Sequence, residues 1–359
     1  MPYDGLEVDM LSVGNADCIL VTNWNASKAT RVLIDGANKS GAEVLKNFLK
    51  KNQITWLDAV VCTHPHDDHA AGLIELLKDK SIGIASAYMH IPHWHADVPS
   101  IKNTLSKIKN SAEAENIRKS LATVEELYSA FTARNIPITE PFSGTQIQFL
   151  TVAGPSKEYY EELVMSFGDS ESIVSLDTQD SLHKIWALMH DKATEELDTE
   201  LPPNPQTTPE NNSSAILGTI RDGRKYLFTA DAGVPALQKA SEAYDLTKCH
   251  WMQIPHHGSR RNINPALINL FSPKNAWASA EGSKKHPRRA VVNAFKQVSA
   301  TVGSTHYPVS SNLWISTGTV PARTNYGPLV PLYEADTLSK KSSDVSSLVW
   351  NSALLRNSR

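Results

Sequence analysis

Apolar and polar residues alternate with a period of two at the start of the chain. The stretch LEVDMLSV, residues 6–13, shows this alternation, and the short apolar runs CILVTN and RVLIDG follow it, separated by polar or Gly residues. Alternation and short apolar runs bounded by turn residues are typical of strands. We therefore predict a β-rich start.

Helical and extended patterns then alternate along the chain. Residues 40–54, SGAEVLKNFLKKNQI, place their apolar side chains at helical spacing. WLDAVVCT has the pattern of a buried strand, AAGLIELLKDK that of a helix, and IGIASAYMHIP that of another strand. Strands that alternate with helices indicate an α/β protein whose helices cover the faces of a sheet.

Two segments interrupt this alternation. Residues 101–135 are rich in helical patterns, and we expect them to cover or cap a site. Residues 158–200 hold twelve Asp or Glu against two Lys and lead into LPPNPQTTPENN, so we expect an acidic surface insertion over about 158–210. Four more β-like runs follow: SSAILGTI, KYLFTAD, CHWMQIP and NAWASA. We predict a single domain over residues 1–330 and a C-terminal tail over 331–359.

Composition narrows the class of protein. With 359 residues, 41% of them apolar, and a formal net charge of −3, the chain can bury a large core and is not a generally basic nucleic-acid binder. Cys18, Cys62 and Cys249 are too few and too far apart for a disulfide framework. No signal peptide and no apolar run of about 18 residues is visible. We therefore expect a cytoplasmic protein without a membrane span.

The stretch THPHDDHAAG concentrates metal-binding side chains at the end of a buried strand. His64 and His66 are two residues apart, so on an extended chain both imidazoles project to the same side and can hold one cation. Asp68 and His69 follow where the chain should turn into a helix, and they can face a second cation about 3.5–4 Å away. The alternative is a polar strand end in which Asp67 or Asp68 only caps the helix.

These residues also carry a family resemblance. HPHDDH resembles the HxHxDH signature of the metallo-β-lactamase fold. MLSVGNADCILV, LIDGA, LFTADAG and QIPHHGS resemble, in the same order, motifs of the soluble hydrolase domain of competence-type ComEC proteins. The resemblance covers about residues 6–290. It implies a four-layer α/β fold, the αββα metallo-β-lactamase sandwich, with two metals at the edge where loops from both sheets meet.

The resemblance also implies further metal ligands. Asp231, at the end of KYLFTA, would bridge the two metals, although its position before Ala232 and Gly233 also suits a plain turn. His257 aligns with the family's PGHG histidine and would complete the second site, with His256 as the alternative. Because adjacent side chains on an extended chain point in opposite directions, we expect only one of the two to bind a given ion. The other would support the site from behind.

The chain departs from the lactamase enzymes at one ligand. Where they carry the third histidine of the first site, this chain has ENNSSAIL, and we expect Asn212 or a water to take the position. Because an oxygen-rich site can favour manganese or magnesium, we expect two divalent ions, zinc or manganese. MHIPHWHADVP offers three more histidines, His90, His93 and His95, which would supply a ligand, contact substrate or only pack.

A basic segment points to the substrate. His286 in KKHPRR matches the family's HP motif, and a cationic imidazole there would protonate a leaving oxygen or hold a phosphate oxygen. Cationic side chains gather at two predicted site loops: Lys284, Lys285, Arg288 and Arg289 beside it, and Arg260 and Arg261 after HHGS. They favour an anionic substrate unless they form an ordinary solvated face. As substrate-binding residues we predict Asn212, Ser259, Arg260 and Lys285.

These features favour a metal-dependent phosphodiesterase or nuclease. In this hypothesis the dimetal centre generates hydroxide at neutral pH, and Asp68 orients it and accepts its proton. The substrate would be anionic and contain phosphate, with nucleic acid as one option, while protein partners are not predicted. The alternatives are hydrolysis of a non-phosphate ester, thioester, lactone or lactam, and a non-catalytic metal-binding regulator. A redox diiron protein is disfavoured, because that group resembles HxExDH and position 66 is His.

Overall fold

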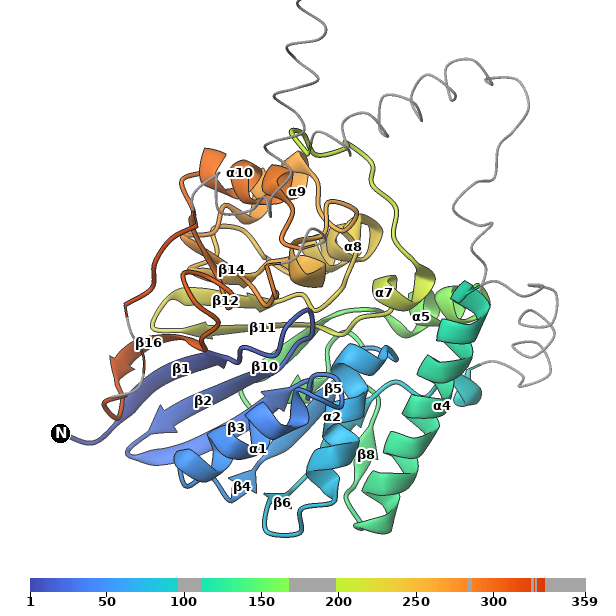
Figure 1. The fold of residues 1–359 in the computed structure, drawn as a ribbon, viewed down its shortest axis with the longest axis vertical. Coiled ribbons are helices and arrows are strands. Elements are labelled where there is room, and N and C mark those ends of the chain that lie inside the picture. Colours follow the sequence, from blue (N-terminus) through green and yellow to red (C-terminus); the bar gives the residue numbers. More distant parts are fainter. Residues whose placement is uncertain (96–111, 168–197, 283–285, 324–325, 327, 333–359) are drawn as a thin grey trace, which may run out of the picture.

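The computed structural model describes residues 1–95, 112–167, 198–282, 286–323, 326 and 328–332, with the backbone alone for 112–120 (Figure 1). Several predicted features lie outside the described residues. They are Lys284 and Lys285, residues 101–111 of the helical segment, residues 168–197 of the acidic insertion and the tail after residue 332.

Among the described residues, the strands form two seven-stranded sheets and one two-stranded sheet. The first sheet has the order β16-β1-β2-β3-β5-β7-β8, with β1 Asp4–Met10, β2 Ile19–Asn25, β3 Lys28–Ile34, β5 Ala59–Cys62, β7 Ala87–Met89, β8 Ile138–Thr139 and β16 Leu313–Thr319. The second has the order β15-β14-β13-β12-β11-β10-β9, with β9 Gln146–Ile147, β10 Leu150–Gly154, β11 Ile216–Arg221, β12 Arg224–Phe228, β13 Trp251–Gln253, β14 Asn275–Ala278 and β15 Thr301–Ser304. The small sheet pairs β4 Trp56–Leu57 with β6 Gly83–Ile84.

Each large sheet changes from antiparallel to parallel pairing. Strands β16, β1, β2 and β3 pair antiparallel, and β3, β5, β7 and β8 pair parallel. In the second sheet β9 to β12 pair antiparallel and β12 to β15 pair parallel. Parallel strands end at the same edge of a sheet, which is where open α/β sheets place their functional loops. The topology therefore gathers the segments that follow β3, β5, β12 and β13.

Helices cover the outer faces of both sheets (Figure 1). On the first sheet they are α1 Ala42–Lys51, α2 Asp67–Leu77 and α4 Ala112–Ala133, and on the second α8 Val234–Ala243, α9 Pro265–Phe271 and α10 Arg289–Gln297. The remaining described helices are α5 Lys157–Val164, α7 Pro209–Asn212 and the short 3-10 helices η1 Pro92–Trp94 and η3 Pro255–Gly258. The predicted four-layer αββα order is confirmed.

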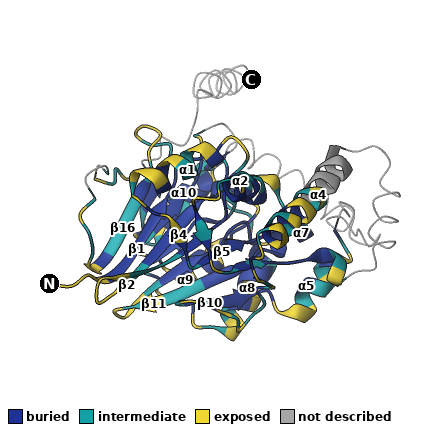
Figure 2. Cartoon of the chain, turned by 90° about the horizontal axis from the view of Figure 1, so that it is seen from below, coloured by how far each residue is buried: buried dark blue, intermediate teal, exposed yellow. Residues whose placement is uncertain are grey.

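The strands are buried on both faces. Val21 and Val32 point into the core between the sheets, where they join Phe228 and Trp251 from the second sheet, whereas Leu20 points outward into the layer under the helices. A strand covered on both sides needs apolar residues at consecutive positions. This explains the unbroken apolar runs, and Figure 2 shows exposed residues concentrated on helices and loops instead. None of the helices in the described ranges combines the length and apolar content that crossing a bilayer would require.

The chain after α10 returns to the first sheet, which the sequence pattern did not reveal. β16 pairs antiparallel with the whole of β1. The segment behind it then covers two carboxylates on the outer face of β1: Arg323 bonds to Glu7 and Asp9 at 3.0 and 3.2 Å, and the Tyr326 hydroxyl donates to Asp9 at 2.7 Å. Burial raises the pKa of Asp9 to about 7, against the opposing effect of Arg323. Polar residues after Val320 thus belong to the packed fold.

Candidate metal centre

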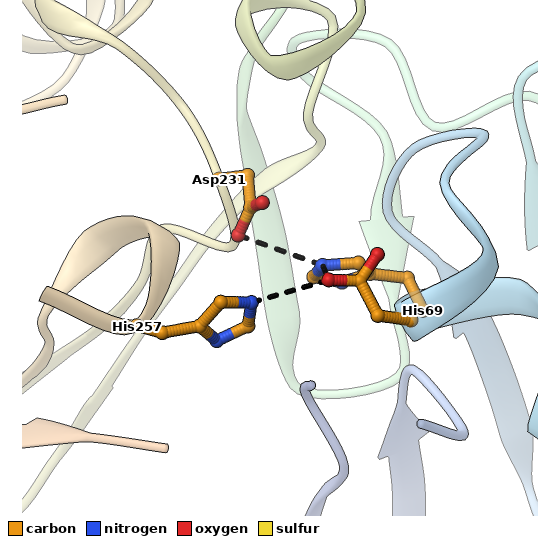
Figure 3. Close-up of side chains that lie close together, drawn as sticks. His69, Asp231 and His257 are labelled. Carbon is orange, nitrogen blue, oxygen red and sulfur yellow. Dashed lines mark hydrogen bonds and ion pairs between the residues drawn. The ribbon is translucent and has the colours of Figure 1, made fainter. Parts of the chain in front are cut away.

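Three strand ends bring His and Asp side chains to one place between the two sheets. The segment after β5 carries His64, His66 and the start of α2, the segment after β12 carries Asp231, and the segment after β13 forms η3. Figure 3 shows Asp231 and His257 facing His69 from the opposite sheet. The structure therefore brings together residues that are up to about 190 positions apart in the chain.

The first candidate cation position lies between His64, His66 and Asp231. His64 Nε2 is 3.0 Å from His66 Nδ1 and 3.7 Å from Asp231 Oδ2. Ligand atoms around one tetrahedral cation, each 2.0–2.1 Å from it, stand roughly 3.3 Å apart. The donor atoms of these three side chains thus lie close to one another and are spaced as ligands of one ion.

The second position lies between Asp68, His69, Asp231 and His257. His257 Nε2 is 3.3 Å from Asp68 Oδ2, and His69 Nε2 is 3.5 Å from Asp231 Oδ1 and 3.9 Å from Asp68 Oδ2. The helix α2 begins at Asp67, earlier than expected, so Asp68 and His69 both lie in its first turn. That turn directs the two side chains to the second position while His64 and His66 serve the first.

Asp231 stands between the two positions. Its Oδ2 faces His64 and its Oδ1 faces His69, and neither oxygen has a hydrogen-bond partner among the described residues although both are buried. Burial opposes its charge, but the nearby histidines, His256 and His69 before the others, hold the pKa of this carboxyl well below its usual range. A buried carboxylate that lacks donors suits coordination to cations. The donor set therefore fits a pair of divalent metals with Asp231 between them.

Asp35 and Asp17 support the histidines from behind, and neither was among the residues predicted for the site. Asp35, directly after β3, bonds His69 Nδ1 at 2.7 Å and accepts from the Thr63 amide at 2.8 Å. Asp17 accepts from Gln253 Nε2 at 2.8 Å and lies 3.7 Å from His257 Nδ1. Burial raises the pKa of Asp17 to about 7. Carboxylates on the second nitrogen fix the orientation of metal-binding histidines. The signal that would have found them is an acidic residue at the strand edge.

The histidine doublet adopts an unusual backbone. His256 has φ 48° and ψ 53°, and His257 has φ 57° and ψ 15°, both left-handed, and Gly258 follows with φ 92°. The chain is not extended at this turn, so both rings can face the centre, each toward a different carboxylate. His256 Nε2 lies 3.5 Å from Asp231 Oδ2, while His257 faces Asp68. Left-handed non-Gly residues cost about 1–3 kcal/mol each and concentrate at functional sites.

The comparison with known families agrees with the layers and the histidine cluster. The sequence model of the Metallo-beta-lactamase superfamily matches residues 11–143, which include strands β2 to β8 and the HPHDDH segment. The chain has the metallo-β-lactamase fold. This fold implies that the cluster binds divalent metal.

Individual relatives are distant. ComE operon protein 3 of Bacillus subtilis (strain 168) is 26% identical over 103 residues, 28% of this chain and 13% of the relative. The metallo-beta-lactamase fold protein YhfI from Bacillus subtilis is 10% identical, covering 88% of this chain and 100% of its own, with a TM-score of 0.44. A long form RNase Z from yeast is 11% identical, covering 77% and 37%, with a TM-score of 0.37. The match to the ComE protein thus spans a small part of either chain.

Within this metallo-β-lactamase fold, the predicted catalytic residue His286 and the residues predicted to bind substrate have mixed surroundings. His286 is buried, with its ring 5.4 Å from that of His256 and 6.0 Å from that of His257. Ser259 is buried and its hydroxyl accepts from the Arg261 amide at 3.2 Å. Asn212, in α7, is buried and its Oδ1 has no hydrogen-bond partner among the described residues. The His286 ring therefore lies beside both rings of the histidine doublet.

Several of the predicted cationic residues form hydrogen bonds within the protein. Arg260 is buried and donates to the Glu200 carbonyl at 3.1 Å. Arg288 Nε bonds to Asp198 at 3.1 Å, and Asp198 also accepts from the Arg289 amide at 2.6 Å, at the start of α10. These acceptors come from the end of the acidic insertion. Arginines that the sequence suggested for binding substrate thus also bond to groups of the protein itself.

The histidines of MHIPHWHADVP form a separate cluster. His90 is buried between the rings of Phe142 and Tyr160, and burial lowers its pKa to about 3. His95 lies between two carboxylates, 2.8 Å from Glu140 and 3.0 Å from Glu161. His93 packs edge-on against Trp94 and Tyr128. Their described contacts are those of a packed cluster between η1 and α5.

Proposed function

We propose that this chain is a metal-dependent hydrolase that cleaves phosphodiesters. The observation that carries the proposal is the position of Asp231, whose two buried oxygens face two separate sets of histidines. Two divalent cations held there would supply activated water at neutral pH and neutralise charge on the reacting group. The side chains of this chain then determine orientation and proton transfer.

Asp68 is suited to hold the attacking water and take its proton. Its side chain is 32% exposed, whereas those of His69 and His257 are nearly fully buried. Burial opposes its charge, but His69 and His257 hold its pKa well below the usual range, so it is a carboxylate at neutral pH. A carboxylate that is fixed by His257 and still reaches solvent can orient a water molecule.

His286 is suited to the leaving group. Its ring lies beside both histidines of the doublet, on the side of the centre contributed by the second sheet. A protonated imidazole there would hold a phosphoryl oxygen or donate a proton to the departing oxygen. The exposed Arg261 follows the same turn and carries positive charge. Together they support an anionic substrate, and nucleic acid is the polymer we propose to test first.

A second candidate is hydrolysis of an uncharged ester, thioester, lactone or lactam. It is favoured by one observation: Arg260 already donates to the Glu200 backbone carbonyl, and Arg288 bonds to the Asp198 carboxylate. Arginines with such internal partners do not require a phosphate group. The two candidates differ in salt dependence, because binding of a nucleic acid weakens steeply as salt rises whereas binding of an uncharged ester does not.

The test is a substrate panel with Mn²⁺ or Zn²⁺. It contains linear DNA, RNA, cyclic nucleotides and bis-p-nitrophenyl phosphate, with a thioester, a lactone and a lactam as the second group. We expect phosphodiester turnover that Asp68→Ala lowers by at least about 100-fold, the lower range for a general base. Equal turnover by the variant would refute the role of Asp68. Purified protein that takes up less than one equivalent of metal would favour a non-catalytic regulator.

We also propose that the protein works in the cytoplasm. Cys18, Cys62 and Cys249 are buried free thiols in the structure, which suits a reducing compartment. Fractionation of the producing cells would test this, since recovery of the protein outside the cytoplasmic fraction would contradict it.

A further inference from the structure

The first cation position is short of a ligand. His64, His66 and Asp231 supply three donors, and the segment that would bring a third histidine has none. Sites that hold zinc tightly use four ligands, or three ligands and a water, with nitrogen prominent among them. We propose that His256 supplies the missing nitrogen through Nε2, so that the doublet serves both cations, His256 the first and His257 the second. This assignment rests on the proposed metal centre.

The distances separate the two histidines by site. His256 Nε2 is 3.5 Å from Asp231 Oδ2, the same oxygen that His64 Nε2 approaches at 3.7 Å. His257 Nε2 is instead 3.3 Å from Asp68 Oδ2, on the other side. Both spacings are close to the roughly 3.3 Å expected between ligands of one tetrahedral ion. His256 thus shares Asp231 Oδ2 with His64 of the first position, and His257 shares Asp68 with the second.

Asn262 fixes the tautomer that His256 needs. The Asn262 amide nitrogen donates to the Asp231 carbonyl at 2.7 Å, which leaves its Oδ1 to face His256 Nδ1 at 2.9 Å. Because an amide oxygen only accepts, Nδ1 carries the proton and Nε2 keeps its lone pair for a cation. Asn211 Nδ2 also lies 3.3 Å from Nδ1, but it has a shorter bond to Thr207 at 2.8 Å. A hydrogen bond on the far nitrogen is the usual setting of a metal-binding histidine.

The backbone explains how two adjacent residues reach two ions. The left-handed conformations of His256 and His257 replace the alternation of an extended chain by a tight turn. The His256 amide is held to the Ala230 carbonyl at 3.0 Å, next to Asp231 itself. The turn is thereby tied to the strand end that carries the shared carboxylate. This connection keeps His256 on the Oδ2 side of Asp231.

Asn212 is the competing ligand for the same position. Its Oδ1 is buried without a hydrogen-bond partner among the described residues. That oxygen lies against Gly233, where an added Cβ would stand 2.6 Å from it. No contact ties it to the oxygen of Asp231 in the described part of the chain, whereas His256 has both the distance and the orienting partner. The two assignments predict different variants to lose metal.

The experiment measures metal binding without substrate. Full-length wild type, His256→Asn, His257→Asn, Asn212→Ala and His64→Ala are titrated with Zn²⁺ against a chromophoric chelator, and with Co²⁺ by visible absorption. Asparagine tolerates a positive φ, so His256→Asn removes the imidazole with little effect on the turn. His250→Asn is the matched control, since His250 lies outside the centre and packs edge-on against Tyr226. Circular dichroism checks that each variant is folded.

We expect two ions in the wild type and in His250→Asn. His256→Asn should keep one ion and bind the other at least about 100-fold more weakly, since loss of an outer partner alone costs 10–100-fold. Its remaining Co²⁺ spectrum should match that of His64→Ala and differ from that of His257→Asn. Two ions at wild-type affinity in His256→Asn would overturn the assignment. So would loss of the first ion in Asn212→Ala with His256→Asn unaffected.

This outcome is separate from the test of function. A wild type that binds two ions in this way but hydrolyses no phosphodiester would refute the proposed substrate and leave the role of His256 supported. A wild type that binds no divalent ion would refute both.

Discussion

Asp35 Oδ2 lies 2.7 Å from Nδ1 of His69, while Nε2 of the same ring approaches Asp231 Oδ1 at 3.5 Å. The same carboxylate accepts from the amide and the hydroxyl of Thr63, at the end of the strand that leads to His64. One acidic side chain at the end of β3 thus orients the segment that carries ligands for both cation positions. This relationship can be tested apart from catalysis.

We predict that Asp35→Asn weakens metal binding by about 10–100-fold, the range for partners of metal-binding histidines. The amide cannot accept from Thr63 and His69 with the strength of a carboxylate. Isothermal titration with Zn²⁺ measures the change. Asp58→Asn is the control, because Asp58 accepts from the Arg31 amide away from the centre. Equal affinities of Asp35→Asn and the wild type would show that Asp35 has no orienting role.

Removing the bridge should affect both ions at once. Asp231→Asn leaves one carbonyl oxygen, so we expect the variant to hold at most one equivalent of metal, by elemental analysis after gel filtration. The wild type should melt a few degrees higher with metal than with a chelator, because a ligand at 100 times its Kd adds about 2.7 kcal/mol of stability. Asp231→Asn should lose most of that difference. A variant that keeps two equivalents and the full metal-dependent shift would contradict the bridging role.

Gly72 controls how closely α2 approaches the end of β3. A Cβ at this position would stand 1.8 Å from the Gly36 carbonyl oxygen, while the Gly36 amide bonds to the His69 carbonyl at 2.9 Å. We predict that Gly72→Ala lowers the free energy of unfolding by about 1–3 kcal/mol and also weakens metal binding. Denaturant unfolding and metal titration measure the two effects. Gly218→Ala is the control, since its nearest contact would be 3.7 Å away. Wild-type stability in Gly72→Ala would exclude this steric account.

The buried carboxylate Asp9 predicts a pH dependence of stability. Its pKa is raised from 3.8 to about 7 by burial. Between these values the folded protein holds a proton that the unfolded chain has lost, so stability should fall as pH rises from about 4 to about 7. The limiting slope is about 1.4 kcal/mol per pH unit. Asp9→Asn should lack this component.

Denaturant unfolding in a chelator, from pH 4.5 to 8, tests the sign. The stability of Asp9→Asn relative to the wild type should increase with pH and level off above about 7. Asp4→Asn, which removes an exposed carboxylate on the same strand, is the control. A flat difference for Asp9→Asn would mean that this carboxyl is not protonated in the folded state near neutral pH.

The sequence by itself determined the features that depend on local periodicity. The alternation in LEVDMLSV and the apolar run in WLDAVVCT indicated strands because the side-chain period of a strand is set by its own backbone. The spacing of His64 and His66 similarly indicated a shared cation, since residues two apart project to one side. The order of these elements indicated α/β layers, and the family resemblance implied the αββα sandwich.

The tertiary structure alone decided which residues, distant in the sequence, orient the metal-binding histidines or pair with the arginines. Asp35 and Asp17 become orienting residues only when the end of β3 and the loop between β1 and β2 meet α2 and η3. Arg288 similarly bonds to Asp198, which reaches the start of α10. The pairing of β16 with β1 was equally hidden, because a partner strand is chosen by packing and not by its own pattern.

The histidine doublet shows this division within two residues. The letters HH suggest a ligand, but the direction of each ring depends on the sign of φ at His256 and His257, which is positive at both. That conformation is costly for a residue with a Cβ and persists only where surrounding contacts fix it. The Ala230 carbonyl and Asn262 supply those contacts at His256, from positions that sequence neighbours do not reveal. Residue types and spacing are local properties, whereas the orientation of a strained turn is set by the elements packed around it.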